Sequence, residues 1–455
     1  MLRDILTWLV AIAALVSFTA QPVAAQGISI LRDAETEALL QDMTDPLAEV
    51  AGLGEGAVEV VLVNDNSINA FVAGGQRIYI HSGLIAAADT ANEVQGVIAH
   101  ELGHITGGHV NRFSEGAGNA TRITLLSALL AVGAALAGGG EAALGILAAG
   151  QQAAVGNFLA FTRTQESSAD AAGAEYLSGA GISGRGSLSF FEKLQNYEFR
   201  RGISQANERE YSRTHPLSGT RLARLREVYM VDPAWDAPDD TGIERRFQAI
   251  KGKLYGFLAP HPRVMAAYPP YMTGTPARYA RAYSYHREAL VEDALAEVTA
   301  LLQAEPDNPY FLELQGQILL ESGRVEEAIA PLRRATSLTG SHPLIAVSLG
   351  HALIESEDDG HYVEAEQVLR SALGRDRENP FAWYQLGRVH THNGDIPRAR
   401  LASAEQQVMQ GNYQGALINA QAAENALPVG SPDWIRAQDV GLQARGLLER
   451  QRDRN

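Results

Sequence analysis

The spacing of apolar residues divides the chain into a leader and two folded parts. Short alternating runs and 3.6-residue patterns are mixed in residues 27–232, whereas the spacing is helical throughout from Pro276 onward. These patterns predict an α+β domain, mostly helical with a small edge β-sheet, followed by an all-α solenoid at residues 276–450. Residues 233–274 are rich in proline and are expected to form a connector with one helix near residues 244–257.

The first residues have the layout of a signal peptide. Arg3 precedes a largely apolar run from Ile5 to Ala20, and Val23-Ala24-Ala25 supplies small residues for cleavage after Ala25. The alternative is an uncleaved anchor helix, but the run is shorter than the roughly 20 residues that span a membrane. We therefore expect residues 1–25 to be removed and the mature chain to reside in the bacterial periplasm.

Composition narrows the class of protein. The 455 residues are 46% apolar and 20% charged, as in ordinary globular proteins, and the net charge is -16. This negative charge argues against nucleic acid or an anionic membrane surface as the main partner. The chain has no cysteine, so packing or a metal must stabilise it in place of disulfides.

The C-terminal part repeats at regular intervals. Gly316 and Gly350 are 34 positions apart, and so are Pro309 and Pro343. This period, with the segment Trp383–Gly387, resembles tetratricopeptide repeats, and a chance helical bundle is the alternative. Small residues then fall where the second helix of each unit packs on the first, at Ala294, Ala328, Ala365 and Ala399. Stacked helix pairs of this kind leave a concave face for binding.

A metal-binding motif lies inside an apolar helical pattern of the first domain. His100-Glu101-Leu102-Gly103-His104 has the HExxH spacing. Residues four apart on a helix differ by about 40° around its axis, so both imidazoles can bind one zinc ion. Glu101 is rotated by about 100° from His100 and can instead act on a metal-bound water.

A catalytic zinc site needs a third protein ligand and an open fourth position. The third histidine of HExxHxxGxxH zincins is replaced here by Val110, and His109 is one position too early. The ligand should therefore come from downstream, where Glu166 and Asp170 lie four apart on one helical face. Glu166 can complete the ligand set and Asp170 can hold a ligand imidazole from behind. A solvated acidic helix face is the alternative.

A second apolar stretch follows the motif. Residues 123–137 are apolar, Gly138-Gly139-Gly140 and Glu141 interrupt them, and residues 142–149 are apolar again. Neither half reaches the length of a spanning helix, so we expect a helical hairpin. The hairpin either packs beside the metal site or touches a membrane, and its content of alanine and glycine favours packing.

These motifs together resemble the HtpX and CAAX-prenyl-endopeptidase family of gluzincins. The resemblance rests on HELGH, the downstream Glu-x-x-x-Asp, Asn69-Ala70-Phe71, and Thr214-His215-Pro216 followed by Arg221. It covers most of the mature chain, although the transmembrane helices of integral-membrane relatives are missing. It implies a gluzincin-type endopeptidase with one Zn2+ bound by His100, His104 and Glu166. Glu101 would be the base, and Asp170 would lie behind the ligands.

The resemblance also implies roles for three further residues. Asn69 would lie on a strand beside the substrate, and Arg221 would lie near the reacting centre. His215 would either occupy the fourth zinc position and inhibit the enzyme, or steady the tetrahedral intermediate. A buried histidine beside a turn proline is the third interpretation of His215.

The segment before the metal motif indicates how a substrate binds. Residues 69–72 and 77–80 flank Gly74-Gly75, which predicts a β-hairpin with an edge strand. An edge strand holds an extended peptide through backbone hydrogen bonds and selects little by sequence. This property suits an enzyme that meets unfolded chains.

Two functions follow as hypotheses. The resemblance implies a periplasmic zinc endopeptidase, with chaperone-like activity, for misfolded or stalled outer-membrane β-barrel proteins. Its repeats would bind unfolded or misassembled substrates and the outer-membrane β-barrel assembly machinery. The alternative is a tetratricopeptide adaptor or chaperone of the cell envelope whose zinc site is structural or silenced by His215. No nucleic acid is expected as a partner, and peripheral membrane contact through residues 123–149 stays open.

Overall fold

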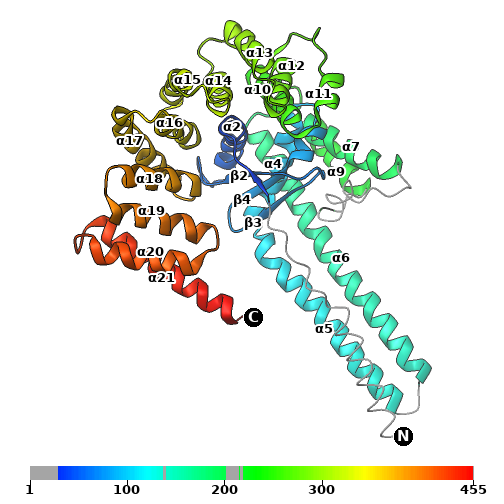
Figure 1. Ribbon diagram of the computed structural model, residues 1–455. Helices are drawn as coiled ribbons and strands as arrows, with labels where there is room; N and C mark the ends of the chain where they lie inside the picture. The colour runs from blue at the N-terminus through cyan, green and yellow to red at the C-terminus, as the bar shows by residue number, and fades with distance from the viewer. Residues whose placement is uncertain (1–28, 137–139, 201–214, 216–218, 454–455) are drawn as a thin grey trace.

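The computed structural model describes residues 29–136, 140–200, 215 and 219–453. The predicted signal peptide lies outside the described residues. Figure 1 shows a mixed domain, a long helical hairpin that leaves it, and a curved array of helices on its other side. The predicted fold class, an α+β peptidase-type domain followed by a helical solenoid, is confirmed.

The first domain contains a four-stranded sheet in its described part, with the order β1-β2-β4-β3. The strands are β1 (Ile30–Leu31), β2 (Glu59–Val63), β3 (Ala70–Ala73) and β4 (Arg77–His81). β3 and β4 pair antiparallel across Gly74 and Gly75, whose φ angles of 64° and 101° need glycine. The predicted hairpin is therefore confirmed, and β3 is an edge strand of this sheet.

Helices surround one central helix of this domain. The central helix is α4 (Ala91–Thr106), which packs against α2 (Ala34–Val50), α6 (Gly140–Gly179), α7 (Arg185–Arg200) and α10 (Thr241–Leu258). The helices α3 (Ser82–Ala87) and α9 (Gly219–Met230) belong to the same domain. Thr90 caps α4 by accepting from the backbone of Glu93, and Glu93 in turn accepts from Asp89 N. Gly108 ends it with a φ of 62°. Between these ends α4 is buried on nearly all sides.

The proline-rich segment is more firmly attached than a flexible linker. It holds α10 and the short helix α11 (His261–Ala267). Phe247 and Ile250 of α10 belong to the core that α4 and the sheet share. Ala249, on the same helix, packs against Tyr279 at the start of the repeats. One helix thus contributes to two cores.

The solenoid consists of antiparallel helix pairs stacked in a curve (Figure 1). The small residues at the predicted packing positions are buried, at Ala294, Ala328, Ala365 and Ala399. A side chain on Gly316 would meet Leu332, and one on Gly350 would meet Leu369, so both glycines allow close helix packing. The helices are α12 (Thr275–Arg287), α13 (Val291–Ala304), α14 (Pro309–Glu321), α15 (Val325–Leu338), α16 (Pro343–Glu355), α17 (Asp359–Arg375), α18 (Pro380–His392), α19 (Ile396–Met409), α20 (Tyr413–Ala426) and α21 (Pro432–Asp453).

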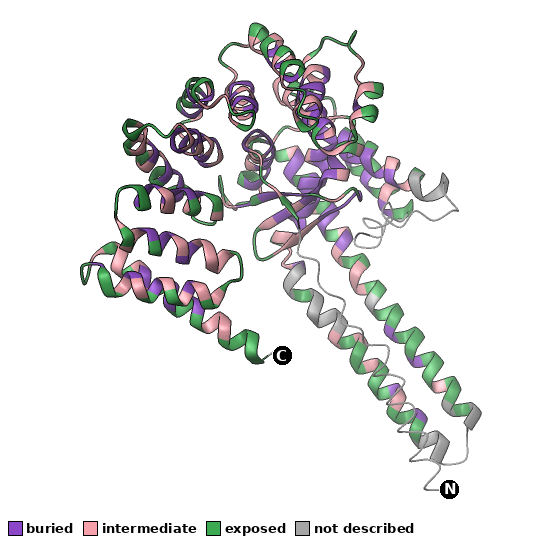
Figure 2. Cartoon of the chain, in the orientation of Figure 1, coloured by how far each residue is buried: buried purple, intermediate pink, exposed green. Residues whose placement is uncertain are grey.

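The predicted helical hairpin is present, but it does not pack beside the metal site as the sequence favoured. It consists of α5 (His109–Leu136) and α6 (Gly140–Gly179), which pack on each other and project away from the domain (Figure 1). Figure 2 shows that most described residues of its distal half are exposed. Packing of the whole stretch beside the metal site is therefore wrong, because only the proximal ends of the two helices reach that site. From Leu144 onward, α6 is long and apolar enough to cross a membrane.

Candidate metal centre

Four buried side chains converge beside α4. His100, His104, Glu166 and His215 offer ligand atoms that all lie within 4.8 Å of one another. His100 Nε2 is 3.1 Å from His104 Nε2 and 3.4 Å from Glu166 Oε2, and His104 Nε2 is 3.4 Å from Glu166 Oε1. Ligand atoms of a tetrahedral zinc ion with bonds of about 2.1 Å would be separated by about 3.4 Å. The donor set and its spacing therefore fit a zinc ion.

Two glycines let the helices of the cluster approach closely. A side chain on Gly103 would lie 2.6 Å from the carbonyl oxygen of Ala169, and one on Gly173 would lie 3.1 Å from the backbone of Ala99 and His100. Only glycine allows this contact between α4 and α6. The contact brings Glu166, from the second helix, to the two imidazoles of the first.

Glu101 faces the cluster without a hydrogen-bond partner among the described residues. Its side chain is fully buried, and neither carboxylate oxygen forms a hydrogen bond there. Its nearest charged neighbour is His215, with Nε2 at 3.4 Å from Oε1. Burial raises the pKa of Glu101. A carboxylate that is buried and free in this way suits a group that accepts a proton from water.

Asp170 and Arg221 lie behind the cluster. Asp170 Oδ1 is 3.0 Å from His100 Nδ1, on the side of the ring away from the other ligands. Arg221 donates to both oxygens of Asp170 at 2.7 Å, and its Nη1 lies 3.0 Å from Glu166 Oε2. This guanidinium, itself buried, therefore holds two carboxylates in place.

His109 is a residue of the site that sequence reasoning did not assign. Its Nδ1 lies 2.9 Å from His104 Nδ1, and its Nε2 lies 3.0 Å from Ser168 Oγ. It is outside the four-residue metal cluster, as expected, but it contacts a ligand from behind. The signal in the sequence was the helix stop at Gly107-Gly108, which turns the chain so that the next residue folds back on α4.

The charges in the cluster are strongly coupled. Burial lowers the pKa of His100, but contacts with Asp170 and Glu166 outweigh it and raise this pKa to about 10. Burial and the charges on His100 and His215 lower the pKa of His104 to about 2. Burial opposes ionisation of Glu166, yet His100 and His215 hold its pKa well below the usual range. A divalent cation would displace the proton held here, because imidazole ligands must be neutral.

His215 lies between the cluster and the edge strand. Its Nδ1 is 3.2 Å from Glu166 Oε1 and 3.3 Å from His100 Nε2. Its Nε2 is 3.3 Å from the carbonyl oxygen of Ala70 on β3. Asn69 directly precedes this strand, and its side chain is buried. The imidazole therefore lies at the fourth position of the cluster, next to the strand expected to bind substrate.

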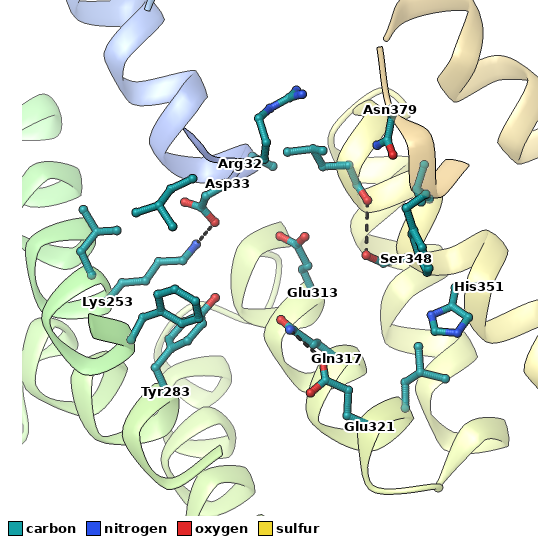
Figure 3. A pocket seen from close by; sticks show the side chains of 18 residues that line it. Arg32, Asp33, Lys253, Tyr283, Glu313, Gln317, Glu321, Ser348, His351 and Asn379 are labelled. Atoms are coloured by element: carbon teal, nitrogen blue, oxygen red, sulfur yellow. Dashed lines mark hydrogen bonds and ion pairs between the residues drawn. The ribbon is translucent and has the colours of Figure 1, made fainter. Parts of the chain in front are cut away.

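A cavity of about 500 Å3 lies elsewhere, where the first domain meets the concave side of the solenoid (Figure 3). Asp33 and Lys253 form an ion pair on one wall, and Glu313 of α14 points into the space. His351 and Phe381, from later repeats, also line the cavity, and the centroids of their two rings are 5.2 Å apart. The lining contains none of the four cluster residues.

Comparison with known proteins identifies the class. Residues 34–229 match the sequence model of peptidase family M48, and residues 279–343 and 357–408 match the tetratricopeptide repeat. The chain is a metalloprotease with an M48 peptidase domain followed by tetratricopeptide repeats.

The chain is similar to several beta-barrel assembly-enhancing proteases. The protein from Escherichia coli (strain K12) is 26% identical over 404 residues, which cover 86% of this chain and 79% of that protein. The one from Yersinia pestis is 26% identical over 395 residues with the same coverage. The metalloprotease LoiP of Escherichia coli is 33% identical over 168 residues, 36% of this chain and 60% of LoiP.

Proposed function

We propose that the chain is a periplasmic zinc endopeptidase with chaperone-like activity that acts on misfolded or stalled outer-membrane β-barrel proteins. The observation that carries the peptidase part is the buried cluster of His100, His104 and Glu166 beside the free carboxylate of Glu101. The substrate part is supported by similarity over 86% of the chain to beta-barrel assembly-enhancing proteases.

In this proposal His100, His104 and Glu166 bind the zinc, which when bound supplies a Lewis acid and lowers the pKa of its water. Glu101 accepts a proton from the attacking water and passes it to the leaving amine. Asp170 and Arg221 are positioning residues, because they contact His100 and Glu166 from behind.

The edge strand β3 supports binding of an extended peptide. Within the described sheet, β4 pairs with one edge of β3, and the other edge of β3 is the edge of the sheet. The carbonyl of Ala70 on β3 is within hydrogen-bonding distance of His215, at the cluster. A peptide added along β3 would place a scissile carbonyl near the metal through backbone hydrogen bonds alone. Asn69 directly precedes this strand, and in this proposal it lies beside the substrate. The cavity on the concave side of the solenoid supports recruitment of substrates or of the barrel assembly machinery by the repeats.

His215 favours a second candidate function, an adaptor with a silenced site. Its contacts with Glu166 and His100 suit a fourth ligand that blocks water from the metal. In that case the repeats would act as a chaperone or adaptor, and hydrolysis would require removal of this imidazole.

One experiment separates the two functions. Cleavage of a denatured β-barrel protein and bound zinc are measured for the mature chain and for Glu101→Gln, His215→Ala and the control His392→Ala. Glu101→Gln should keep zinc and lose at least a hundredfold in activity, because the proton acceptor is removed. His215→Ala should raise cleavage, including self-cleavage, and the control should match the unchanged chain. Cleavage by the Glu101 variant would remove Glu101 from the role of base. A zinc-loaded chain that cleaves only as His215→Ala would favour the silenced adaptor, and one that is inactive even as His215→Ala would contradict the endopeptidase.

A further inference from the structure

The distal half of the α5–α6 hairpin has its large apolar side chains on the outside. Nine of them are at least 43% exposed: Leu125, Leu126, Leu129, Leu130, Val132, Leu144, Leu147, Val155 and Leu159. A helix pair in water buries such residues in its seam. This hairpin instead presents them to the surroundings on both helices.

Small residues form the seam of the hairpin. Ser127 and Ala131 of α5 are buried, and so are Gly150 and Ala154 of α6. A side chain on Gly150 would lie 2.1 Å from Ser127 Oγ, so the two helices approach as closely as glycine permits. Small residues in the seam with leucine outside are the pattern of helices that pack in lipid, where leucine gains nothing by leaving the surroundings.

Polar groups along the hairpin also suit a medium of low polarity. Ser127 Oγ donates to Ile123 O at 2.8 Å, and Thr124 Oγ1 donates to Ala120 O at 3.0 Å, within their own helix. Between Arg122 and Arg163 the sequence has one ionisable residue, Glu141. The remaining polar side chains there, such as Gln151, are uncharged.

Exposed arginines flank the apolar part. Arg122 lies just before it on α5, and Arg163 follows it on α6. The net charge of -16 belongs to the whole chain, so it does not exclude a local contact between these arginines and anionic headgroups. Residues 123–136 of α5 are about 21 Å long at 1.5 Å per residue, which exceeds one leaflet of about 15 Å but not the whole hydrocarbon core of about 30 Å.

We propose that the distal half of the α5–α6 hairpin inserts into a lipid bilayer, with Arg122 and Arg163 at anionic headgroups. The hairpin enters and leaves the bilayer on the same side, because α5 and α6 are consecutive helices that pack on each other and return to the same domain. Leu159 is seven residues before Glu166, about 10 Å along α6, so the metal cluster lies close to the membrane surface. Chains at that surface are then the nearest substrates, a consequence that rests on the proposed peptidase function.

Vesicle flotation tests insertion without any dependence on activity. The mature chain from Gln26, carrying Glu101→Gln to prevent self-cleavage, is mixed with vesicles of equimolar phosphatidylethanolamine and phosphatidylglycerol. A triple change of Leu126, Leu129 and Leu130 to Asp should reduce partitioning more than tenfold. The matched control changes Val363, Ile418 and Leu442 to Asp, which are equally exposed apolar residues of the repeats, and should float like the parent.

A second measurement locates the inserted residues. Since the chain has no cysteine, Leu129→Cys and Leu442→Cys can each carry a single environment-sensitive dye. On adding vesicles, the emission of the first should shift to the blue and that of the second should not. Arg122→Gln with Arg163→Gln should weaken binding to the anionic vesicles by about fivefold per arginine, and binding to phosphatidylcholine vesicles much less.

Three outcomes would overturn the proposal. The first is that the parent chain does not float with vesicles. The second is that the hairpin triple variant floats as well as the parent. The third is that the emission of the dye at position 129 does not change when vesicles are added. A dimer in size-exclusion chromatography that the triple variant abolishes, with no vesicle binding by the parent, would make this surface a contact between two copies instead. Melting curves that match the parent show that each variant is folded.

Discussion

At the residue scale, each proposed metal ligand has its own supporting contact. Asp170 lies behind His100, His109 behind His104, and Arg221 behind Glu166. Such contacts fix the orientation of a ligand before the metal arrives, which lowers the cost of ordering the site. Glu101, the proposed base, is the exception, because its carboxylate has no hydrogen-bond partner among the described residues.

Removal of His109 should weaken the metal site without abolishing it. In His109→Ala the Nδ1 of His104 loses its contact, so we expect zinc affinity to fall by about tenfold or more. Competition with a fluorescent chelator measures this affinity directly. His361→Ala, in the repeats, is the control and should bind zinc as tightly as the unchanged chain. Equal affinities for the two variants would mean that His109 plays no part in holding His104.

At the scale of elements, the crossing of α4 and α6 creates the site. Glu166 reaches the imidazoles only because Gly103 and Gly173 let two backbones touch. The same crossing fixes where the hairpin leaves the domain, since α6 continues from the cluster into the apolar region. The positions of the metal site and of the hairpin are therefore linked.

A methyl group at Gly103 should separate these helices. In Gly103→Ala the new carbon would lie 2.6 Å from a backbone oxygen, so we expect a loss of about 1–3 kcal/mol in stability and less bound zinc. Thermal unfolding and zinc content measure both effects. Gly145→Ala on α6 has open space around it and should be neutral or slightly stabilising. If Gly103→Ala bound zinc normally, the close crossing would not be required.

At the scale of the whole molecule, the solenoid curves around the first helix of the peptidase domain. Ala34 of α2 packs with Leu312 and Ile345 of the repeats. Tyr279 donates to Glu35 at 2.6 Å, and Lys253 forms ion pairs with Asp33 and Glu35. Buried charges at this contact make it specific in orientation, so the two parts should move as one unit.

The carboxyl group of Glu313 should make stability depend on pH. Burial raises its pKa to about 8; Lys253 opposes this shift, and Asp33 and Glu35 add to it. The folded chain then keeps a proton that the unfolded chain releases above its ordinary pKa of 4.5. Stability due to this group is present at pH 4.5 and falls by up to about 1.4 kcal/mol per pH unit until about pH 8.

Thermal unfolding of the full chain between pH 5 and pH 8 tests this effect. Glu313→Gln should flatten the fall in Tm over that range, because the titrating group is gone. Glu326→Gln, an exposed change on the neighbouring helix α15, should leave the slope as it is. Parallel slopes for the unchanged chain and Glu313→Gln would show that the carboxyl is not protonated in the folded state.

Local patterns in the sequence determined the metal helix, the edge hairpin and the repeats. HExxH, the Gly74-Gly75 turn and the 34-residue period each depend on residues that are near one another along the chain, where helix and strand geometry fix the spacing. The downstream Glu166 was also predictable, since a zinc site lacking a third ligand requires one.

Only the tertiary structure decided how distant residues meet. His109 contacts His104 because the helix stop at Gly107-Gly108 folds the chain back, and Arg221 contacts Asp170 and Glu166 because α9 packs beside α6. The resemblance implied a place for Arg221 near the reacting centre, but no periodicity encodes these contacts. The apolar hairpin was predicted from composition, but its direction was not, because alanine and glycine suit both a seam in water and a seam in lipid. The sequence determined which side chains are available to the site and to the hairpin. The packing of the helices determined which of these side chains meet and which face the surroundings.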